Sequence, residues 1–427
     1  MKKIIVLFSV FTFFFNAAFA YELTREEKEQ TYNELELLAD CLSIVQSRYV
    51  DSTAPKDLVY GALSGMLEAL DPHSLFLTPE DYTDLLEDTS GKFGGLGIEI
   101  AMRDGVLTVI TPLEDTPAWS AGIQPNDKIV EIEGGLTKDM SLSEAVKLLR
   151  GDPGTEVRIT ILREKEAKIF EQSLVRAVIR VKVVRKAVML DDGIGYVRIS
   201  DFGEETGPEL GKALRKLHSQ GLKGLILDLR SNPGGLMTSA VDVASYFLGP
   251  KKLVVYTLDR DKAREEYFTH STNITLTDMP LVVLVNDGSA SASEIVAGCM
   301  QDHKRGLVVG VNTYGKASVQ SLIPLAGEAA LKLTTAIYYP PNGRLVNGKG
   351  IKPDIEVQQK VFAEEEPDEK SAEEVFDKVR QMEKHEQDQE NASAVPDKGE
   401  DDKDFYKSDY QIIRALDLIR GLVILNK

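Results

Sequence analysis

The chain has 427 residues, enough for about three folded units at roughly 150 residues each, which excludes a single small binding module. Hydrophobic residues make up 43% and charged residues 28%, a composition typical of globular proteins rather than fibrous or disordered ones. The 68 acidic residues outnumber the 50 basic ones, and the net charge of −18 opposes attraction to phosphates, so we expect no nucleic acid partner. Two distant cysteines, Cys41 and Cys299, indicate neither a disulfide framework nor a zinc knuckle.

Residues 1–20 have the pattern of a secretory signal peptide. Two lysines precede the apolar run 4–15, and Ala18-Phe19-Ala20 fits the small-x-small cleavage pattern. The alternative is an uncleaved membrane anchor, but this run of 12 residues is shorter than the roughly 20 that span a bilayer. We therefore expect an exported protein, periplasmic or otherwise extracytoplasmic, whose mature chain begins at Tyr21. A membrane association stays open.

Two regions follow the signal. Residues 21–87 are rich in Glu, Leu and Ala with apolar residues at helical spacing, which predicts a helical N-terminal region. Between 88 and 165, short β-type runs are broken by Gly and Pro. One helix interrupts these runs, because Ser141 and Glu144 form a capping box ahead of apolar residues at helical spacing.

Residues 166–360 predict a larger α/β unit, because continuous apolar runs typical of buried strands alternate with helical patterns. The clearest of these strand runs are 225–229, 253–258, 281–285 and 307–311. Residues 361–404 carry 17 acidic and 6 basic side chains, which indicates a solvated linker, disordered or loosely helical. An apolar stripe at helical spacing in 405–427 favours a docking or dimerisation helix over a membrane span.

A glycine-rich run, Gly94-Gly95-Leu96-Gly97-Ile98, precedes a predicted strand in the small β-rich unit. Successive backbone N–H groups in such a turn form a concavity that binds anions, among them a peptide carboxylate. An ordinary strand entry is the alternative. Together with residues 121–129 and the helix after Ser141, however, the unit resembles a PDZ domain. The resemblance implies that a bound chain terminus places its carboxylate on the N–H groups of Leu96, Gly97 and Ile98, with Ile98 replacing the family's usual aromatic residue.

A second candidate site lies where the apolar run 281–285 leads through small residues into a predicted helix. A serine at that turn lies near the positive end of the helix dipole, where free N–H groups can form an oxyanion hole. The alternative is structural, because Ser291 and Glu294 also fit a capping box.

A nucleophilic serine needs a base. None of the five histidines (73, 218, 270, 303 and 385) belongs to a recognisable nucleophile motif, although triad partners need not be close in sequence. Lys316 follows the strand run 307–311, between Gly315 and Ala317. A lysine acts as a base only when neutral, so burial must lower its pKa from about 10.4 toward neutrality. A solvated loop lysine is the alternative.

Taken together, these features resemble the carboxyl-terminal processing proteases, also called tail-specific proteases. The resemblance extends to about residue 360 and rests on several motifs in a fixed order. These are Asp71-Pro72-His73-Ser74, the PDZ domain, and residues 227–235, 288–294, 314–320 and 348–354. It implies a multidomain α/β protein with a helical N-terminal region, a PDZ domain, a crotonase-like protease core, an acidic linker and a C-terminal helix.

Carried over by position, the resemblance places the nucleophile on Ser291, rather than on Ser289 or Ser293, and the general base on Lys316. The glutamine that orients the lysine falls on Gln320. Because four residues of extended strand span about 13 Å, Gln320 reaches Lys316 only if the segment turns or the glutamine folds back.

The resemblance also supplies oxyanion donors, the N–H groups of Ala292 and Gly235, with Gly234 as the alternative glycine. Glycine suits this role because no Cβ obstructs the approach of the tetrahedral intermediate. Arg150, at the end of the PDZ helix, is a candidate for coupling peptide capture to assembly of the active site. A favourable charge at the helix C-terminus is its structural alternative.

The implied activity is that of a serine endopeptidase that needs no metal or cofactor and acts on proteins or peptides with apolar C-termini. Two other classes stay open: a PDZ scaffold whose core has lost catalysis, and a hydrolase or isomerase that uses the same core on another substrate. Helical segments at both ends are compatible with a homodimer, and an adaptor or activating partner is also left open.

Overall fold

A computed structural model describes residues 24–103, 105–138, 140–359 and 405–425. The predicted signal segment and the acidic linker lie outside the described residues. The chain forms two compact units, one up to Pro72 and one from His73 onward, and each is described by itself.

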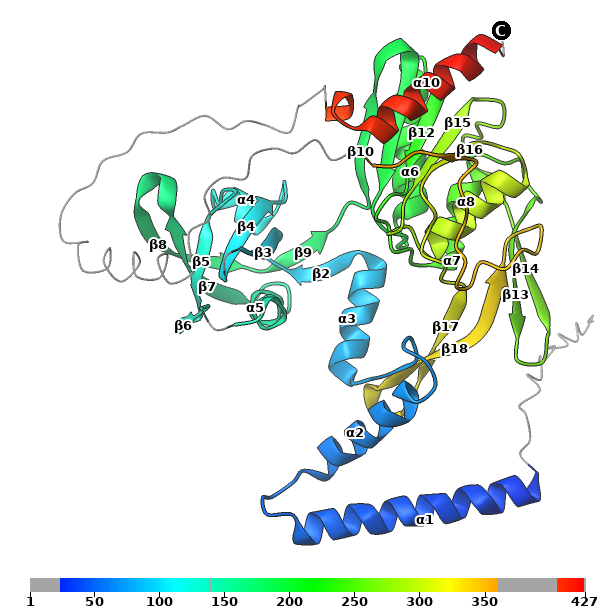
Figure 1. Cartoon of the computed structure of the whole chain (residues 1–427). Coiled ribbons are helices and arrows are strands. Elements are labelled where there is room, and N and C mark those ends of the chain that lie inside the picture. The colour runs from blue at the N-terminus through cyan, green and yellow to red at the C-terminus, as the bar shows by residue number, and fades with distance from the viewer. Residues whose placement is uncertain (1–23, 104, 139, 360–404, 426–427) are drawn as a thin grey trace, which may run out of the picture. The chain divides into compact units, whose positions relative to one another are not determined.

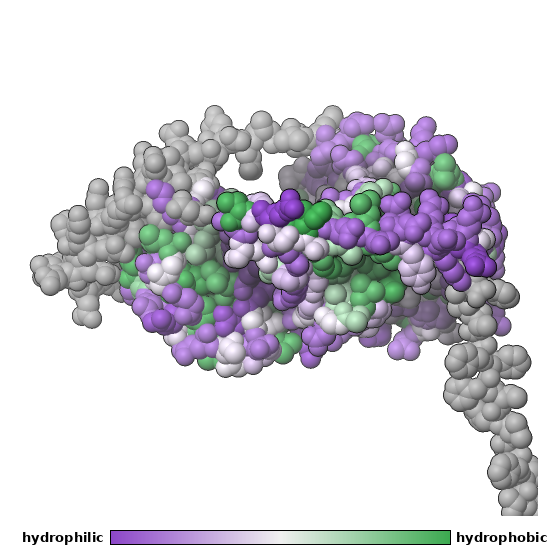
Figure 2. All heavy atoms as spheres, turned by 90° about the horizontal axis from the view of Figure 1, so that it is seen from below, coloured by the Kyte–Doolittle hydropathy of each residue, from purple (hydrophilic) through white to green (hydrophobic). Residues whose placement is uncertain are grey.

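The first unit consists of two helices, α1 (Arg25–Arg48) and α2 (Pro55–Glu68). Thr24 and Glu27 form a capping box that starts α1, and Pro55 begins α2 at a position where its missing N–H is harmless. Helix α1 has no buried residue and exposes large apolar side chains, among them Tyr32, Leu35 and Ile44. In the space-filling view of the whole chain in Figure 2, hydrophobic residues (green) are interspersed with hydrophilic residues (purple) over the visible face.

The second unit begins with β1 (Leu75–Leu77), α3 (Pro79–Ser90) and β2 (Lys92–Gly95). The periodicity of the sequence indicated helices up to residue 87 and missed β1, whose three residues are too few to show a period. Strand β1 is extended because it pairs with a distant strand, β18 (Ala330–Tyr339).

The β-rich unit is a sheet in the order β3-β4-β5-β7-β8, with β6 paired to β5. Its strands are β3 (Ile98–Arg103), β4 (Val106–Pro112), β5 (Lys128–Ile132), β6 (Gly135–Leu136), β7 (Glu156–Arg163) and β8 (Lys168–Val175). The short helix α4 (Pro117–Ser120), the turn η1 (Glu164–Glu166) and α5 (Leu142–Leu149) complete it. The Ser141–Glu144 capping box is formed as predicted. The sheet continues past residue 165, where we expected the unit to end, because the turn after β7 returns the chain as a hairpin.

Strand β2 pairs with β9 (Ala177–Arg180), and the chain then enters the larger α/β unit. A sheet in the order β10-β11-β12-β15-β16-β19 forms its centre, parallel from β11 onward. The strands are β10 (Val184–Met189), β11 (Ile194–Ile199), β12 (Gly224–Asp228), β15 (Leu281–Val285), β16 (Leu307–Gly310) and β19 (Ile355–Glu356). All residues of β12 and β15 are buried, as their continuous apolar runs predicted.

Helices cover both faces of this sheet (Figure 1). Helices α6 (Thr206–Ser219), α7 (Met237–Ser245) and α8 (Ala292–Asp302) share one core with the odd-numbered side chains of β15. The other face packs against α10 (Tyr410–Leu425), preceded by the turn η4 (Phe405–Lys407). Close contact with α10 explains Gly224 in β12, because a Cβ there would lie 2.4 Å from Cγ2 of Ile419.

A second, antiparallel sheet has the order β1-β18-β13-β14, with β17 also paired to β18. Its remaining strands are β13 (Leu253–Asp259), β14 (Arg264–Phe268) and β17 (Ser318–Pro324), and two further turns are η2 (Asp191–Gly193) and η3 (Ala326–Glu328). Among the helices of the described residues, none is long and apolar enough to cross a membrane.

Candidate active site

Ser291 lies at the start of α8, just beyond the carboxyl end of the buried strand β15. Its backbone has φ +52° and ψ −112°, a conformation that costs about 1–3 kcal/mol in a residue other than glycine and occurs mainly at functional sites. The neighbouring Ser289 and Ser293 are fully buried, and their hydroxyls donate to the carbonyls of Leu229 and Asn232. Ser291 is only half-buried, so it is the serine of this run that a substrate can reach.

Residues 231–235, here called the oxyanion loop, follow β12 in the chain and lie against Ser291 in space. A Cβ on Gly234 would lie 2.7 Å from Cβ of Ser291, so this close approach requires glycine. The Gly234 N–H donates to Oδ1 of Asn232 at 2.9 Å, whereas Gly235 is exposed beside it. Of the two glycines that the sequence left open, the geometry therefore favours Gly235 as an oxyanion donor.

Glu294 connects the serine segment to the lysine segment. One carboxylate oxygen, Oε2, accepts from the N–H of Ser291 and from the N–H of Lys316, each at 2.9 Å. The other, Oε1, accepts from the Gly315 N–H and from the hydroxyl of Thr313. The side chain is fully buried, and this burial raises the pKa of the Glu294 carboxyl, an effect that its four hydrogen bonds oppose.

Tyr338 makes a second connection between the same two segments. This buried tyrosine in β18 donates from its hydroxyl toward the carbonyls of Ser291, at 3.1 Å, and Lys316, at 2.9 Å. Glu294 thus holds the N–H groups of both residues, and Tyr338 lies against their carbonyls. The backbones of Ser291 and Lys316 are consequently fixed relative to each other, with Lys316 half-buried between buried Gly315 and Ala317.

Gln320 lies in β17, and its amide nitrogen donates to the hydroxyl of Thr334 on β18 at 3.2 Å. The N–H of Thr334 donates in turn to the buried hydroxyl of Ser74, which belongs to the Asp71-Pro72-His73-Ser74 motif. A register shift between Val319 and Gln320 interrupts the extended strand on the way back to Lys316. The structure thus fixes the amide of Gln320 from β18, and its contact with Lys316 stays a prediction.

Two carbonyls of the loop formed by Leu96, Gly97 and Ile98 are bound by the neighbouring segment of the chain. The carbonyls of Leu96 and Gly97 accept from the N–H groups of Ala118 and Leu113. Because C=O and N–H of a trans peptide unit point in opposite directions, the N–H groups of Gly97 and Ile98 point away from that segment. Gly97 has φ +76°, and a Cβ there would lie 2.3 Å from Cβ of Thr116.

Arg150 is the C-cap residue of α5, and its backbone N–H donates to the Val146 carbonyl, but the last two carbonyls of the helix do not bind its side chain. The carbonyls of Leu148 and Leu149 accept from the guanidinium of Arg176 instead. The Arg150 guanidinium lies 3.1 Å from Oδ1 of Asp88, on α3, and 4.4 Å from the ring centroid of Phe93. Arg150 thus contacts α3 and β2 from the C-terminal end of α5, and both explanations of its role stay open.

Comparison with known proteins identifies the family. Residues 193–357 match peptidase family S41, residues 108–163 match a PDZ domain, and residues 16–81 match the N-terminal domain of the activating protease CtpB. The carboxy-terminal-processing protease of Bartonella bacilliformis is 40% identical over 361 residues, which cover 83% of this chain and 82% of that protein. The chain belongs to the carboxyl-terminal processing proteases.

Other relatives of this protease carry similar names. The carboxy-terminal processing protease CtpA of Bacillus subtilis is 34% identical over 75% of this chain and 68% of its own length. A solved structure named photosystem II D1 C-terminal processing protease is 30% identical, covers 76% of this chain and 93% of that chain, and has a TM-score of 0.46.

Sequence reasoning missed Tyr338 and took the capping role of Glu294 as a sufficient explanation of that residue. Tyr338 lies 47 residues from Ser291 within a strand, and nothing in its local sequence marks it. Glu294 does carry a local signal, the spacing of three residues from Ser291, but the pattern does not reveal the bonds to Gly315 and Lys316.

Replacing Glu294 tests whether it positions the two segments. In Glu294→Gln an amide NH₂ replaces one acceptor and faces N–H donors, so we expect kcat to fall about 10²-fold, as for a misplacement of about 1 Å. The matched control is Glu144→Gln, which alters the exposed capping box of α5 and should leave kcat unchanged. Steady-state cleavage of an unfolded protein measures both.

The same substitution also changes how the stability of the protease depends on pH. Because the pKa of Glu294 is raised in the folded state, its contribution to the free energy of unfolding falls as pH rises from the usual 4.5 through the raised value. Over this window the free energy of unfolding of Glu294→Gln, relative to that of the unmodified protease, should rise with pH, and denaturant unfolding at several pH values measures it. An unchanged kcat in Glu294→Gln would show that Glu294 does not position Ser291 and Lys316.

Proposed function

We propose that this protease is a serine endopeptidase that uses Ser291 as nucleophile and Lys316 as general base, and that selects substrates by C-terminal tails bound to its PDZ domain. The observation that carries the proposal is the shared support of the two residues by Glu294 and Tyr338. A core that had lost catalysis would have no reason to keep a buried carboxylate, whose desolvation opposes folding, at this junction.

The chemistry follows from the proposed roles. Oγ of Ser291 attacks the carbonyl carbon of the scissile peptide, and its proton passes to the neutral amine of Lys316. The N–H groups of Gly235 and Ala292 bind the oxyanion that forms. Lys316 then returns the proton to the leaving nitrogen as the C–N bond breaks, which leaves an acyl ester on Ser291.

Water completes the cycle. Lys316 takes a proton from water as the water oxygen attacks the ester carbon, and the proton then goes to Oγ of Ser291 as the acid product leaves. In this scheme the amide oxygen of Gln320 accepts from the Lys316 amine and orients it. The hydrogen bond from Gln320 to Thr334 supports this role, because it holds the amide in one orientation.

Tail selection uses the edge of the PDZ sheet. Strand β3 is an end strand of that sheet, so a substrate tail can add to it as a further strand. Its terminal carboxylate would bind at Leu96, Gly97 and Ile98, where the orientation of two N–H groups supports the proposal. Apolar tails are the expected ligands.

We infer that Arg150 couples binding of the tail at the PDZ domain to the conformation of the oxyanion loop, through a short series of contacts. Asp88, its partner, precedes Thr89, whose carbonyl accepts from the N–H of Glu204 at 3.2 Å. Phe202 lies two residues before Glu204. Its backbone N–H donates to the Gly234 carbonyl, and its carbonyl accepts from the N–H of Leu236, the residue after Gly235. A displacement of Arg150 therefore acts on the segment that holds the loop. Export, the homodimer and the activating partner stay predictions.

The register of the serine run provides the first test. Ser291→Ala should lower cleavage of an unfolded protein with an apolar C-terminus by at least about 10³-fold, because no attacking oxygen remains. Ser289→Ala is the matched control, and it should cleave while losing about 2 kcal/mol of stability, because its hydroxyl donates to Leu229 and accepts from the N–H of Asn286. Equal activity of Ser291→Ala and the unmodified protease would contradict the proposal and favour a scaffold or another chemistry.

Arg150→Ala tests the coupling. We expect about a 10-fold lower kcat on a substrate with a free apolar tail and an unchanged tail affinity of the PDZ domain. A substrate with an amidated tail should be slow in both proteins. Because the Arg150–Asp88 pair is solvent-accessible, stability should change little.

The matched control for this variant is Arg158→Ala, an exposed arginine elsewhere in the PDZ domain, which should behave like the unmodified protease. Unchanged cleavage of the free-tail substrate by Arg150→Ala would show that the contact series carries no signal.

A further inference from the structure

Arg230 is a charged side chain at the root of the oxyanion loop. It lies two residues beyond the end of β12 and directly before Ser231, where the loop begins. The residue is only 9% exposed. A guanidinium that is nearly withdrawn from water must be paired on all sides, because an unpaired buried charge is strongly destabilising.

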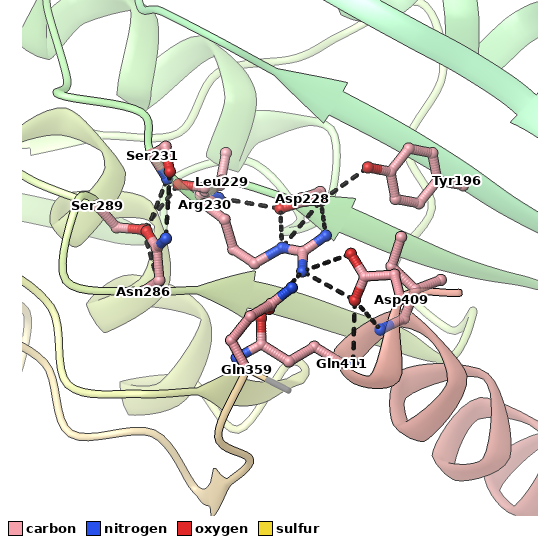
Figure 3. A network of polar contacts seen from close by, with 11 residues as sticks. Tyr196, Asp228, Leu229, Arg230, Ser231, Asn286, Ser289, Gln359, Asp409 and Gln411 are labelled. Carbon is pink, nitrogen blue, oxygen red and sulfur yellow. Dashed lines mark hydrogen bonds and ion pairs between the residues drawn. The ribbon is translucent and has the colours of Figure 1, made fainter. Parts of the chain in front are cut away.

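Two separate parts of the chain provide its partners (Figure 3). On one edge, Nε and Nη2 donate to the carboxylate of the fully buried Asp228, at 2.9 and 2.6 Å. On the other edge, Nη1 lies 2.9 Å from Oδ2 of Asp409 and 2.9 Å from Oε1 of Gln411, with Gln359 at 3.4 Å. Two of the three partners of Nη1 therefore belong to the start of α10.

The start of α10 is itself firmly held. Gln411 is 1% exposed, and its amide nitrogen donates to the Val357 carbonyl at 2.7 Å. Asp409 accepts from the N–H groups of Gln411 and Ile412. Ile412 is buried against the sheet, and so is Ile419, which lies two turns further along the same face of α10. The acceptors that α10 offers to Arg230 are thus fixed by packing and by hydrogen bonds.

Beyond Arg230 the loop adopts a backbone that needs support. Ser231 has φ +54°, Gly234 +103° and Gly235 +137°. Asn286 holds the first of these residues, since its Oδ1 accepts from the Ser231 N–H at 2.7 Å. The strained loop is thus fixed at its root by Arg230 and Asn286, and its far end lies against Ser291.

We propose that Asp409 and Gln411 are positioning residues of the protease, which hold the oxyanion loop in its catalytic geometry through Arg230. The inference rests on the proposed function, because it assigns the oxyanion to this loop. It makes α10 part of the catalytic arrangement as well as a cover for the sheet. If α10 were only a cover, its polar groups at Arg230 would affect stability and leave kcat unchanged.

The test uses the full chain with Asp409→Ala and Gln411→Ala combined. Loss of two acceptors leaves Nη1 with Gln359, so we expect Arg230 and the loop to shift and kcat to fall at least about 10-fold, with KM unchanged. Cleavage is measured on an unfolded protein with a free apolar tail, well below the unfolding temperature recorded by circular dichroism. The control combines Arg414→Ala with Asp417→Ala, an exposed pair on the same helix, and should keep kcat.

Two further variants make the result decisive. Asp409→Asn keeps an acceptor for Nη1 and for the N–H groups of Gln411 and Ile412, so its kcat should stay near that of the unmodified protease. Gln411→Met keeps the volume of the side chain and removes both the acceptor for Nη1 and the donor to Val357. It should lower kcat about 3-fold even if the double alanine variant does not fold.

An unchanged kcat in the folded double alanine variant, or in Gln411→Met, would overturn the inference. Failure of the underlying function would look different, because the unmodified protease would then not cleave, or Ser291→Ala would cleave equally well.

Discussion

The buried carboxylate of Glu294 is the interaction on which the candidate site depends. Ser291 and Lys316 belong to separate loops that follow different strands, and neither loop is regular structure. One oxygen of Glu294 binds the N–H groups of both residues, and its partner oxygen binds the segment just before the lysine. Because burial raises the pKa of this carboxyl, ionising it opposes stability, so we infer that the charge is retained for the geometry it imposes.

The parallel sheet explains why these loops meet. The carboxyl ends of neighbouring parallel strands lie at one edge of a sheet, where α/β proteins bind their ligands. Strands β12 and β15 are neighbours, so the oxyanion loop and the Ser291 turn emerge side by side. Helices on both faces then stabilise this edge: α8 carries Ser291, and α10, from the opposite face, provides acceptors for Arg230.

Local patterns predicted much of the fold and less of the site. The buried strands were predictable because a continuous apolar run can be recognised without knowing which strands it pairs with. The α5 capping box was predictable because all its residues lie within four positions of the sequence. The pattern Ser-x-x-Glu occurs at both Ser141 and Ser291, yet its outcome differs. Glu144 is exposed, with its pKa lowered by hydrogen bonds from Ser141, whereas Glu294 is buried, with its pKa raised by desolvation.

What distinguishes the two glutamates is their long-range surroundings, and these are absent from a window of a few residues. The same holds for Tyr338, whose two carbonyl contacts cross from one strand to two loops, and for Arg230, whose partners lie up to 181 residues away. The family resemblance supplied positions for the nucleophile, base and glycine. The groups that hold them became visible only when the chain was folded.

The most direct test of the account is the pH dependence of cleavage by the unmodified protease and by Lys316→Ala, with an unfolded protein that has an apolar C-terminus as substrate. We predict that activity of the unmodified protease rises through a titration well below the value of about 10.4 for a free lysine, and that Lys316→Ala is inactive across the range. Activity in Lys316→Ala with the same pH profile would contradict the account, because another group would then activate Ser291.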